Sequence, residues 1–234
     1  MAIYHFSSYS GTSNSVPFNP ETDVFTFDSS SISPTAVGFV FTASTAAFSF
    51  GGTTVTLNAS PLSLTPSNLT FASGGQFLLG DQLISTTGDF STGKQSSGSA
   101  SSDVIIGFDG QDSMSGNGGN DFFYLLSSNA ISADAVDGGD GTDRVTFFSY
   151  NSANGAFLGQ VGGINVNLAN GTATQGSTTV QLTSIEEVRI AGSNGNTYGM
   201  TGSAADDSLI VGGNTGTNTA VYNIDGGAGN DYLA

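Results

Sequence analysis

The sequence predicts an all-β fold on three observations. Short segments with alternating apolar and polar residues recur through the first 95 residues, and Asp23 to Asp28 (DVFTFD) is the clearest of them. A nine-residue rhythm of glycine and aspartate begins at Gly98. No stretch sustains a helical period of apolar residues. The aromatic residues are all Phe and Tyr, which favour strands.

Residues 1–95 are predicted to form a small, sandwich-like N-terminal β-domain. Gly51 and Gly52 offer a tight turn between two apolar runs, which predicts a β-hairpin over residues 48–57. Further strands are expected within residues 23–28, 37–50, 69–71 and 77–79. A segment rich in Ser, Thr and Gly then leads into the next unit.

Three nonapeptides stand in register over residues 98–106, 107–115 and 116–124. Each opens with glycine, holds aspartate at the sixth position and places an apolar residue at the eighth. Two later copies cover residues 138–146 and 226–234, and two weaker ones cover residues 192–200 and 202–210. The repeats therefore define two blocks, residues 96–146 and residues 192–234.

Residues 147–191 form a different segment, which we expect to be a β spacer inserted between the two blocks. Residues 164–168 alternate with period two, and further strands are predicted at residues 180–182 and 185–190. Asn170-Gly171 supplies a turn between them.

The charge balance is strongly acidic, with 19 Asp and Glu residues against three basic ones and a net charge of -16. The basic residues are Lys94, Arg144 and Arg189. Nucleic acid and anionic membranes would repel such a chain, which excludes them as direct partners. Three cations cannot neutralise 19 anions through internal ion pairs, so a divalent metal is the expected counter-charge.

The nonapeptide has the chemistry of a calcium site. Its glycines permit positive φ and close approach of the backbone, which lets carbonyl oxygens converge. Calcium takes six to eight oxygen ligands at about 2.3–2.6 Å, more than one such turn supplies. Two turns stacked in one column would supply enough, so Asp103 and Asp121, two repeats apart, are predicted to share an ion.

One coil would then contain two nonapeptides, with turns in two opposite columns. Asp112 is predicted to belong to the second column and to meet the turn formed by Gly138 to Asp143 there. The eighth-position residues are expected to point inward as a narrow core: Ile105, Met114, Phe123 and Val145.

Several Ca²⁺ ions are predicted, and folding should be coupled to their binding. The predicted ligands are Ser101, Asp103, Asp109, Gly110, Asp112, Gly116, Gly118, Asp121, Gly138, Asp140, Asp143, Asp207, Asp225, Gly226 and Asp231.

These residues resemble the RTX family of calcium-binding proteins, whose repeat is G-G-x-G-x-D-x-U-x. The resemblance extends from Gly98 to the end of the chain and implies a parallel β-roll. It also implies type I secretion, with folding outside the cell where calcium is plentiful. Ser99, Ser101 and Thr197 depart from the repeat and predict weaker sites. Because the family's secretion signal follows its repeats, we expect this sequence to be part of a longer protein.

The expected function is non-enzymatic and structural, in a surface layer, filament or adhesin on the cell surface. The expected partners are further copies of the chain or other surface components, including polysaccharide and lipopolysaccharide. The alternative is a calcium-dependent carrier module of a larger secreted enzyme, toxin or ligand-binding adhesin.

Catalysis finds little support in the sequence. His5 is the single histidine, and Glu186-Glu187 would face opposite ways on a strand. The sequence contains neither G-x-S-x-G nor H-E-x-x-H. Cysteine is absent, the first residues do not form a secretory signal peptide, and no apolar run reaches membrane-spanning length.

Overall fold

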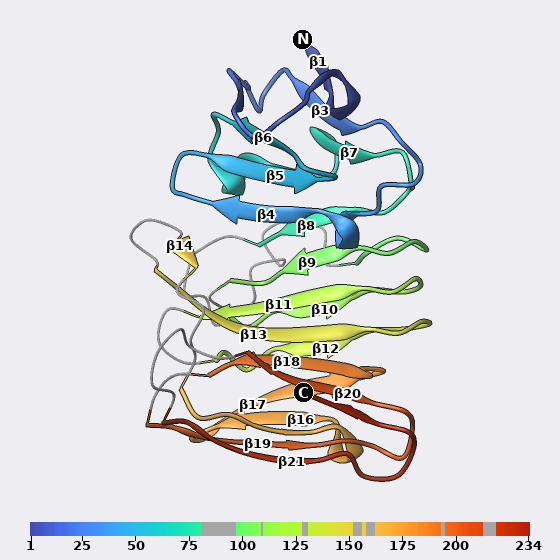
Figure 1. Cartoon of the computed structure of the whole chain (residues 1–234), viewed down its shortest axis with the longest axis vertical. Coiled ribbons are helices and arrows are strands. Elements are labelled where there is room, and N and C mark those ends of the chain that lie inside the picture. The colour runs from blue at the N-terminus through green and yellow to red at the C-terminus, as the bar shows by residue number, and fades with distance from the viewer. Residues whose placement is uncertain are drawn as a thin grey trace.

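A computed structural model describes residues 1–80, 97–108, 110–127, 131–151, 156–157, 162–192, 195–212 and 219–234 (Figure 1). Strands make up 46% of the chain, which confirms the all-β prediction. The described helices are single 3₁₀ turns, η1 (Phe6–Ser8), η2 (Pro34–Ala36), η3 (Pro61–Ser63) and η5 (Leu168–Asn170). No helix in the described part of the chain is long and apolar enough to cross a membrane.

The N-terminal region contains two small sheets. One is parallel, in the order β1 (Ile3–His5), β3 (Val24–Phe27) and β7 (Leu69–Phe71). The other has the order β2 (Asn14–Val16), β6 (Thr53–Leu57), β5 (Ala46–Phe50) and β4 (Gly38–Phe41).

The predicted hairpin is confirmed in the second of these sheets. Strands β5 and β6 are antiparallel, and Phe50 pairs with Thr53 across the turn. Gly51 and Gly52 have φ of 56° and 80°, and a turn with positive φ at both central residues matches the twist of the flanking strands. Phe48 of β5 and Phe27 of β3 in the other sheet are both fully buried and pack edge to face, with ring centroids 6.0 Å apart.

An eight-stranded sheet lines one side of the repeat region. Apart from the short β14 (Ala156–Phe157), which pairs antiparallel with β13, its neighbouring strands are parallel. Its order is β8 (Phe77–Leu79), β9 (Val104–Ile106), β11 (Phe122–Ser127), β13 (Arg144–Asn151), β18 (Glu187–Ala191), β20 (Ser208–Gly212) and β22 (Tyr232–Leu233). Strand β8 joins this sheet to the N-terminal region, because it pairs directly with β9.

A seven-stranded sheet lines the other side. Its order is β10 (Ser113–Ser115), β12 (Ala135–Asp137), β17 (Thr178–Thr183), β16 (Thr172–Gln175), β15 (Asn165–Asn167), β19 (Thr197–Thr201) and β21 (Val221–Asp225). Strands β15, β16 and β17 form an antiparallel meander within otherwise parallel pairs. This meander lies within residues 147–191, the segment predicted to be a β spacer, and Gly171 ends the turn before β16 with φ of 64°.

The chain alternates between these two sheets from β9 to β13, which stacks successive strands as parallel rungs (Figure 1). The eighth-position side chains Ile105, Met114, Phe123 and Val145 are all buried in one cluster with residues of the spacer. The inward orientation predicted for them is therefore confirmed. Because every second residue of a strand faces this core, the intervening residues form the outer face of each sheet.

Candidate metal-binding turns

A column of acidic residues follows one edge of the eight-stranded sheet. Each member immediately precedes a strand of that sheet. The residue two positions further on is apolar and buried in every case except Leu233, which follows Asp231 and is 47% exposed. The column consists of Asp103, Asp121, Asp143, Glu186, Asp207 and Asp231.

Hydrogen bonds connect these acids into a ladder. The backbone N–H of Asp103 donates to Asp121 Oδ1 at 2.7 Å, and that of Asp121 donates to Asp143 Oδ1 at 2.7 Å. The Asp143 N–H continues the series by donating to Glu186 Oε2 at 2.9 Å. Each carboxylate thus satisfies the amide of the acid one rung earlier. Asp103 and Asp121, the pair predicted to share an ion, are direct neighbours in this ladder.

The predicted second column is wrong in one respect. Asp112 does not meet the turn from Gly138 to Asp143; its N–H donates to Asp134 Oδ1 at 2.9 Å. Strand β12 follows Asp134 and pairs with β10, so a glycine-free segment occupies this rung. The Gly138 turn then returns the chain to the first column, where Asp143 follows Asp121.

Three of the carboxylates in the column keep one buried oxygen without a hydrogen-bond partner, namely Asp121, Asp143 and, through its Oδ1 atom, Asp207. Asp121 and Asp143 are fully buried, and the Oδ2 atom of each receives no hydrogen bond. A buried polar atom in this state is costly unless a charge or donor compensates it. Asp103 differs, because the N–H of Ser99 donates to its Oδ2 at 2.6 Å.

The same carboxylate oxygens leave no room for a side chain at the first position of each turn, so this position must be glycine. A Cβ on Gly116 would overlap both Asp121 Oδ2 and the carbonyl oxygen of Gly138. A Cβ on Gly138 would likewise overlap Asp143 Oδ2 and the carbonyl oxygen of Ser184. Each of these glycines therefore lies against one carboxylate oxygen of its own turn and one carbonyl oxygen of the next. This donor set, made wholly of oxygen, fits calcium.

Burial raises the pKa of Asp121 to about 7 and that of Asp143 to about 6, and it also raises the pKa of Asp103. Neighbouring carboxylates add to the first two shifts. The basic side chains in the described residues do not relieve them, since Arg144 and Arg189 both pair with Glu187. The ionised column therefore lacks positive charge of its own.

Carbonyl oxygens would have to supply most ligands of any bound cation. Within the described ranges, no group of three or more His, Cys, Asp or Glu side chains is placed to hold a metal ion by side chains alone. Asp121 and Asp143 each contribute a carboxylate, and the glycine turns bring backbone oxygens beside them. At the fourth position of these turns, Gly119 and Gly141 have φ of 106° and 145°, a conformation that favours glycine.

The remaining predicted ligands differ in where the structure places them. Asp207 and Asp231 repeat its arrangement, with the Asp207 N–H donating to Asp231 Oδ1 at 3.0 Å. Asp140 and Asp225 are exposed, and Asp225 Oδ1 accepts the N–H of Gly227. Asp109 lies outside the described residues. Ser101, Gly110, Gly118 and Gly226 all lie in turns, where their carbonyl groups rather than side chains would be the ligands.

Sequence reasoning missed three residues that take part in these columns. Glu186 occupies the rung after Asp143, Asp134 occupies the rung after Asp112, and the Gln76 N–H donates to Asp103 Oδ1 at the start of the ladder. The missed signal is an acid two residues before a buried apolar residue. Both Glu186-Glu-Val188 and Asp134-Ala-Val136 carry it without the glycines.

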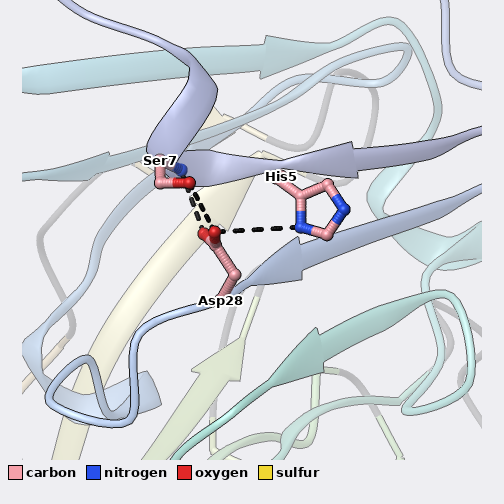
Figure 2. A network of polar contacts seen from close by, with 3 residues as sticks. All are labelled: His5, Ser7 and Asp28. Carbon is pink, nitrogen blue, oxygen red and sulfur yellow. Dashed lines mark hydrogen bonds and ion pairs between the residues drawn. The ribbon is translucent and has the colours of Figure 1, made fainter.

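His5 takes part in a separate polar network near the N-terminus. Figure 2 shows Asp28 between Ser7 and His5, with Ser7 Oγ donating to Asp28 Oδ2 and His5 Nδ1 lying 3.8 Å from the same oxygen. Ser7 and His5 both contact the Asp28 carboxylate. In nucleophilic catalysis the serine hydroxyl would instead donate to the imidazole. The hydrogen bonds from Ser7 lower the pKa of Asp28.

Comparison of the chain with protein families, with curated proteins and with solved structures finds no match. The resemblance to the RTX family therefore stays a prediction that depends on the repeats and on the turns they form.

The raised carboxyl pKa values predict how the calcium-free protein responds to pH. The carboxyl groups of Asp121 and Asp143 bind protons more tightly in the folded state than in the unfolded state. Their pKa values in the folded state are about 7 and 6, above the ordinary value of 3.8. The stability they contribute is present in full below the unfolded pKa and is lost as the pH rises through about 6 to 7. Thermal melts of metal-free protein, followed by circular dichroism, should show a falling melting temperature between about pH 5 and pH 8.

A double variant, Asp121→Asn with Asp143→Asn, is the control for general charge repulsion. It should flatten this dependence in metal-free buffer. A wild-type melting temperature that holds steady or rises over the same range would contradict the role given to these carboxyls.

Proposed function

We propose that this chain is a non-enzymatic calcium-binding protein of the RTX type with a structural role in an extracellular, cell-surface assembly. In this proposal the repeat region is a parallel β-roll that is completed by calcium between successive turns. Export by type I secretion would deliver the chain to the calcium outside the cell, where calcium binding would stabilise the folded state. The runner-up is a calcium-dependent carrier module of a larger secreted protein.

The observation that carries the proposal is the ladder of buried acids. Asp103, Asp121 and Asp143 are fully buried one above another, and two of them hold an oxygen without a hydrogen-bond donor. A column of ionised carboxylates in a glycine-rich backbone is unfavourable on its own, because burial and mutual repulsion both oppose the charged form. A divalent cation between the rungs would reverse both effects.

Asp121 and Asp143 are the residues best placed to hold such a cation. Their Oδ2 atoms have no competing hydrogen bond, and each lies beside the first glycine of its own turn and a carbonyl oxygen of the next. Bound calcium would supply positive charge and join neighbouring turns. The Asp103 turn is expected to bind more weakly, since Ser99 donates to the Oδ2 atom that the turns of Asp121 and Asp143 leave open.

Self-association in calcium is supported by the charge of the chain. The net charge of -16 opposes association of its copies, and calcium would reduce that repulsion.

Light scattering during a calcium titration tests the structural role. We expect the protein to remain small with magnesium alone and to form particles of much higher mass at about millimolar calcium, since magnesium demands a tighter octahedral site. Electron microscopy of the same samples should show ordered sheets or filaments. A protein that binds calcium and stays monomeric throughout would favour the carrier module instead.

A further inference from the structure

A pocket of about 750 Å³ lies between β4 and the outer face of the eight-stranded sheet. Gly38 to Phe41 of β4 form one wall, and residues of β11, β13, β18 and β20 form the floor. These floor residues belong to the face opposite the repeat core, because the alternate residues of the same strands are buried in that core. The metal-binding turns contribute no side chain to this pocket.

The side chains of the pocket floor form rows across the sheet, because the strand register places residues of neighbouring strands opposite one another. Tyr124 lies opposite Thr146, Thr146 opposite Arg189, and Arg189 opposite Ile210. The row before it places Arg144 opposite Glu187. The floor is thus charged at one end and changes to apolar and small residues toward Phe148, Ala191 and Gly212.

The charged end carries an excess of positive charge, in a chain with only three basic residues. Glu187 Oε1 lies 3.5 Å from an Nη atom of Arg144 and 2.8 Å from Nε of Arg189, so one carboxylate serves two guanidinium groups. Arg144 also lies over the ring of Phe122, with Cζ 3.2 Å from its centroid. Together these three charges sum to about +1, which suits a ligand with a single negative charge.

Two buried polar atoms of the lining have no partner. Arg144 Nε donates no hydrogen bond, and Thr146 Oγ1 neither donates nor accepts one. The two residues are only 8% and 3% exposed. Both residues line the pocket. Buried donors in this state are normally satisfied by a ligand, ion or water, since leaving them unmade is costly.

Most of the remaining lining is apolar. Phe39 packs edge to face on Tyr124 with ring centroids 5.2 Å apart, and Phe148 and Ile210 extend the apolar surface of the floor. Too few polar groups line this pocket to satisfy the many hydroxyls of a sugar. A multiply charged anion is also disfavoured, because the excess charge at the floor is about one unit and the whole chain is acidic.

We propose that this pocket binds a small apolar monocarboxylate. The carboxylate lies on Arg189 and Thr146, where a charge-assisted hydrogen bond and the open hydroxyl meet it. The apolar body lies against Phe39, Phe148 and Ile210. This site is independent of the proposed calcium role, and it adds a ligand-binding activity to the chain.

Calorimetric titration of the full chain in saturating calcium tests the site with two carboxylates and their matched alcohols. The aliphatic pair is decanoate and 1-decanol, and the aromatic pair is 2-naphthoate and 2-naphthalenemethanol. At least one carboxylate should bind about tenfold or more tightly than its alcohol, the effect of one charge-assisted hydrogen bond. Which pair binds separates an aliphatic from an aromatic ligand.

Two variants locate the carboxylate. Arg189→Gln removes a side chain that is 46% exposed and so should fold normally, and it should weaken carboxylate binding about tenfold without affecting the alcohol. Thr146→Val keeps the shape of the side chain and should weaken it several-fold. Asn58→Asp, at an exposed position outside the pocket, changes the net charge by the same amount as Arg189→Gln and should leave binding unaltered.

The proposal is overturned if neither carboxylate binds at millimolar concentration. Equal binding of carboxylate and alcohol would also overturn it, as would unchanged carboxylate binding by Arg189→Gln and Thr146→Val. Because all titrations use folded protein, whose circular dichroism is checked first, these outcomes are separate from any failure of the calcium proposal.

Discussion

Asp121→Asn is expected to destabilise the protein in calcium and to stabilise it without calcium. Asparagine keeps the oxygen that accepts the Asp103 N–H, so the ladder bond survives. It loses the charge that a cation needs, and calcium affinity at this turn should fall by about 100-fold, equivalent to roughly 2.7 kcal/mol. Without metal, the same loss of charge relieves a buried carboxylate whose pKa is raised to about 7, and stability should rise by about 1–3 kcal/mol.

Urea unfolding of wild type and variant, each with calcium and with chelator near pH 8, measures this reversal of sign. Glu21→Gln is the matched control, because it removes one negative charge from an exposed N-terminal position. It should change the free energy of unfolding by no more than about 0.5 kcal/mol, both with calcium and with chelator. If Asp121→Asn destabilises the protein equally in both conditions, the carboxylate is a structural hydrogen-bond acceptor and the turn holds no cation.

Gly116→Ala is expected to destroy the turn at which it occurs, whereas Gly118→Ala two residues away should be tolerated. The new Cβ of Gly116→Ala would overlap Asp121 Oδ2 and the Gly138 carbonyl oxygen, the two atoms assigned to the cation. At Gly118 the nearest atoms to a Cβ are 3.9 Å and 4.0 Å away, which is ordinary contact, and φ there is not positive.

Both substitutions keep the carbonyl and remove the same backbone freedom from the unfolded chain, so the pair isolates the crowding of the oxygens. Gly116→Ala should cost about 1–3 kcal/mol or more and lower the number of bound ions. Gly118→Ala should be neutral or stabilise by about 0.4–1 kcal/mol. Unfolding free energies and ion counts from calcium titration measure both effects. Equal effects of the two variants would refute the oxygen arrangement.

The sequence predicted the local elements of this fold well. Alternating apolar residues located strands such as β3, and Gly51-Gly52 located the hairpin of β5 and β6, because turn chemistry and strand period act over a few residues. The eighth-position core was also predictable, since aspartate fixes the start of each short strand and the side chains then alternate.

The rung order was not predictable from the glycine motif alone. Asp134 and Glu186 occupy rungs without any of the turn glycines, and the motif therefore gave no sign of them. Their places follow from tertiary pairing, because β12 pairs with β10, and β18 pairs with β13 after the chain has formed β15 to β17. The pocket between β4 and the outer sheet face was equally hidden, since it joins segments more than 80 residues apart in sequence.

The most direct measurement of the central claim is anomalous diffraction from crystals of the protein grown with millimolar calcium. The account predicts a calcium peak between the turns of Asp121 and Asp143, bound by their carboxylates and by backbone carbonyl oxygens. Density with no ion there, and with both Oδ2 atoms hydrogen-bonded to protein or water alone, would contradict it.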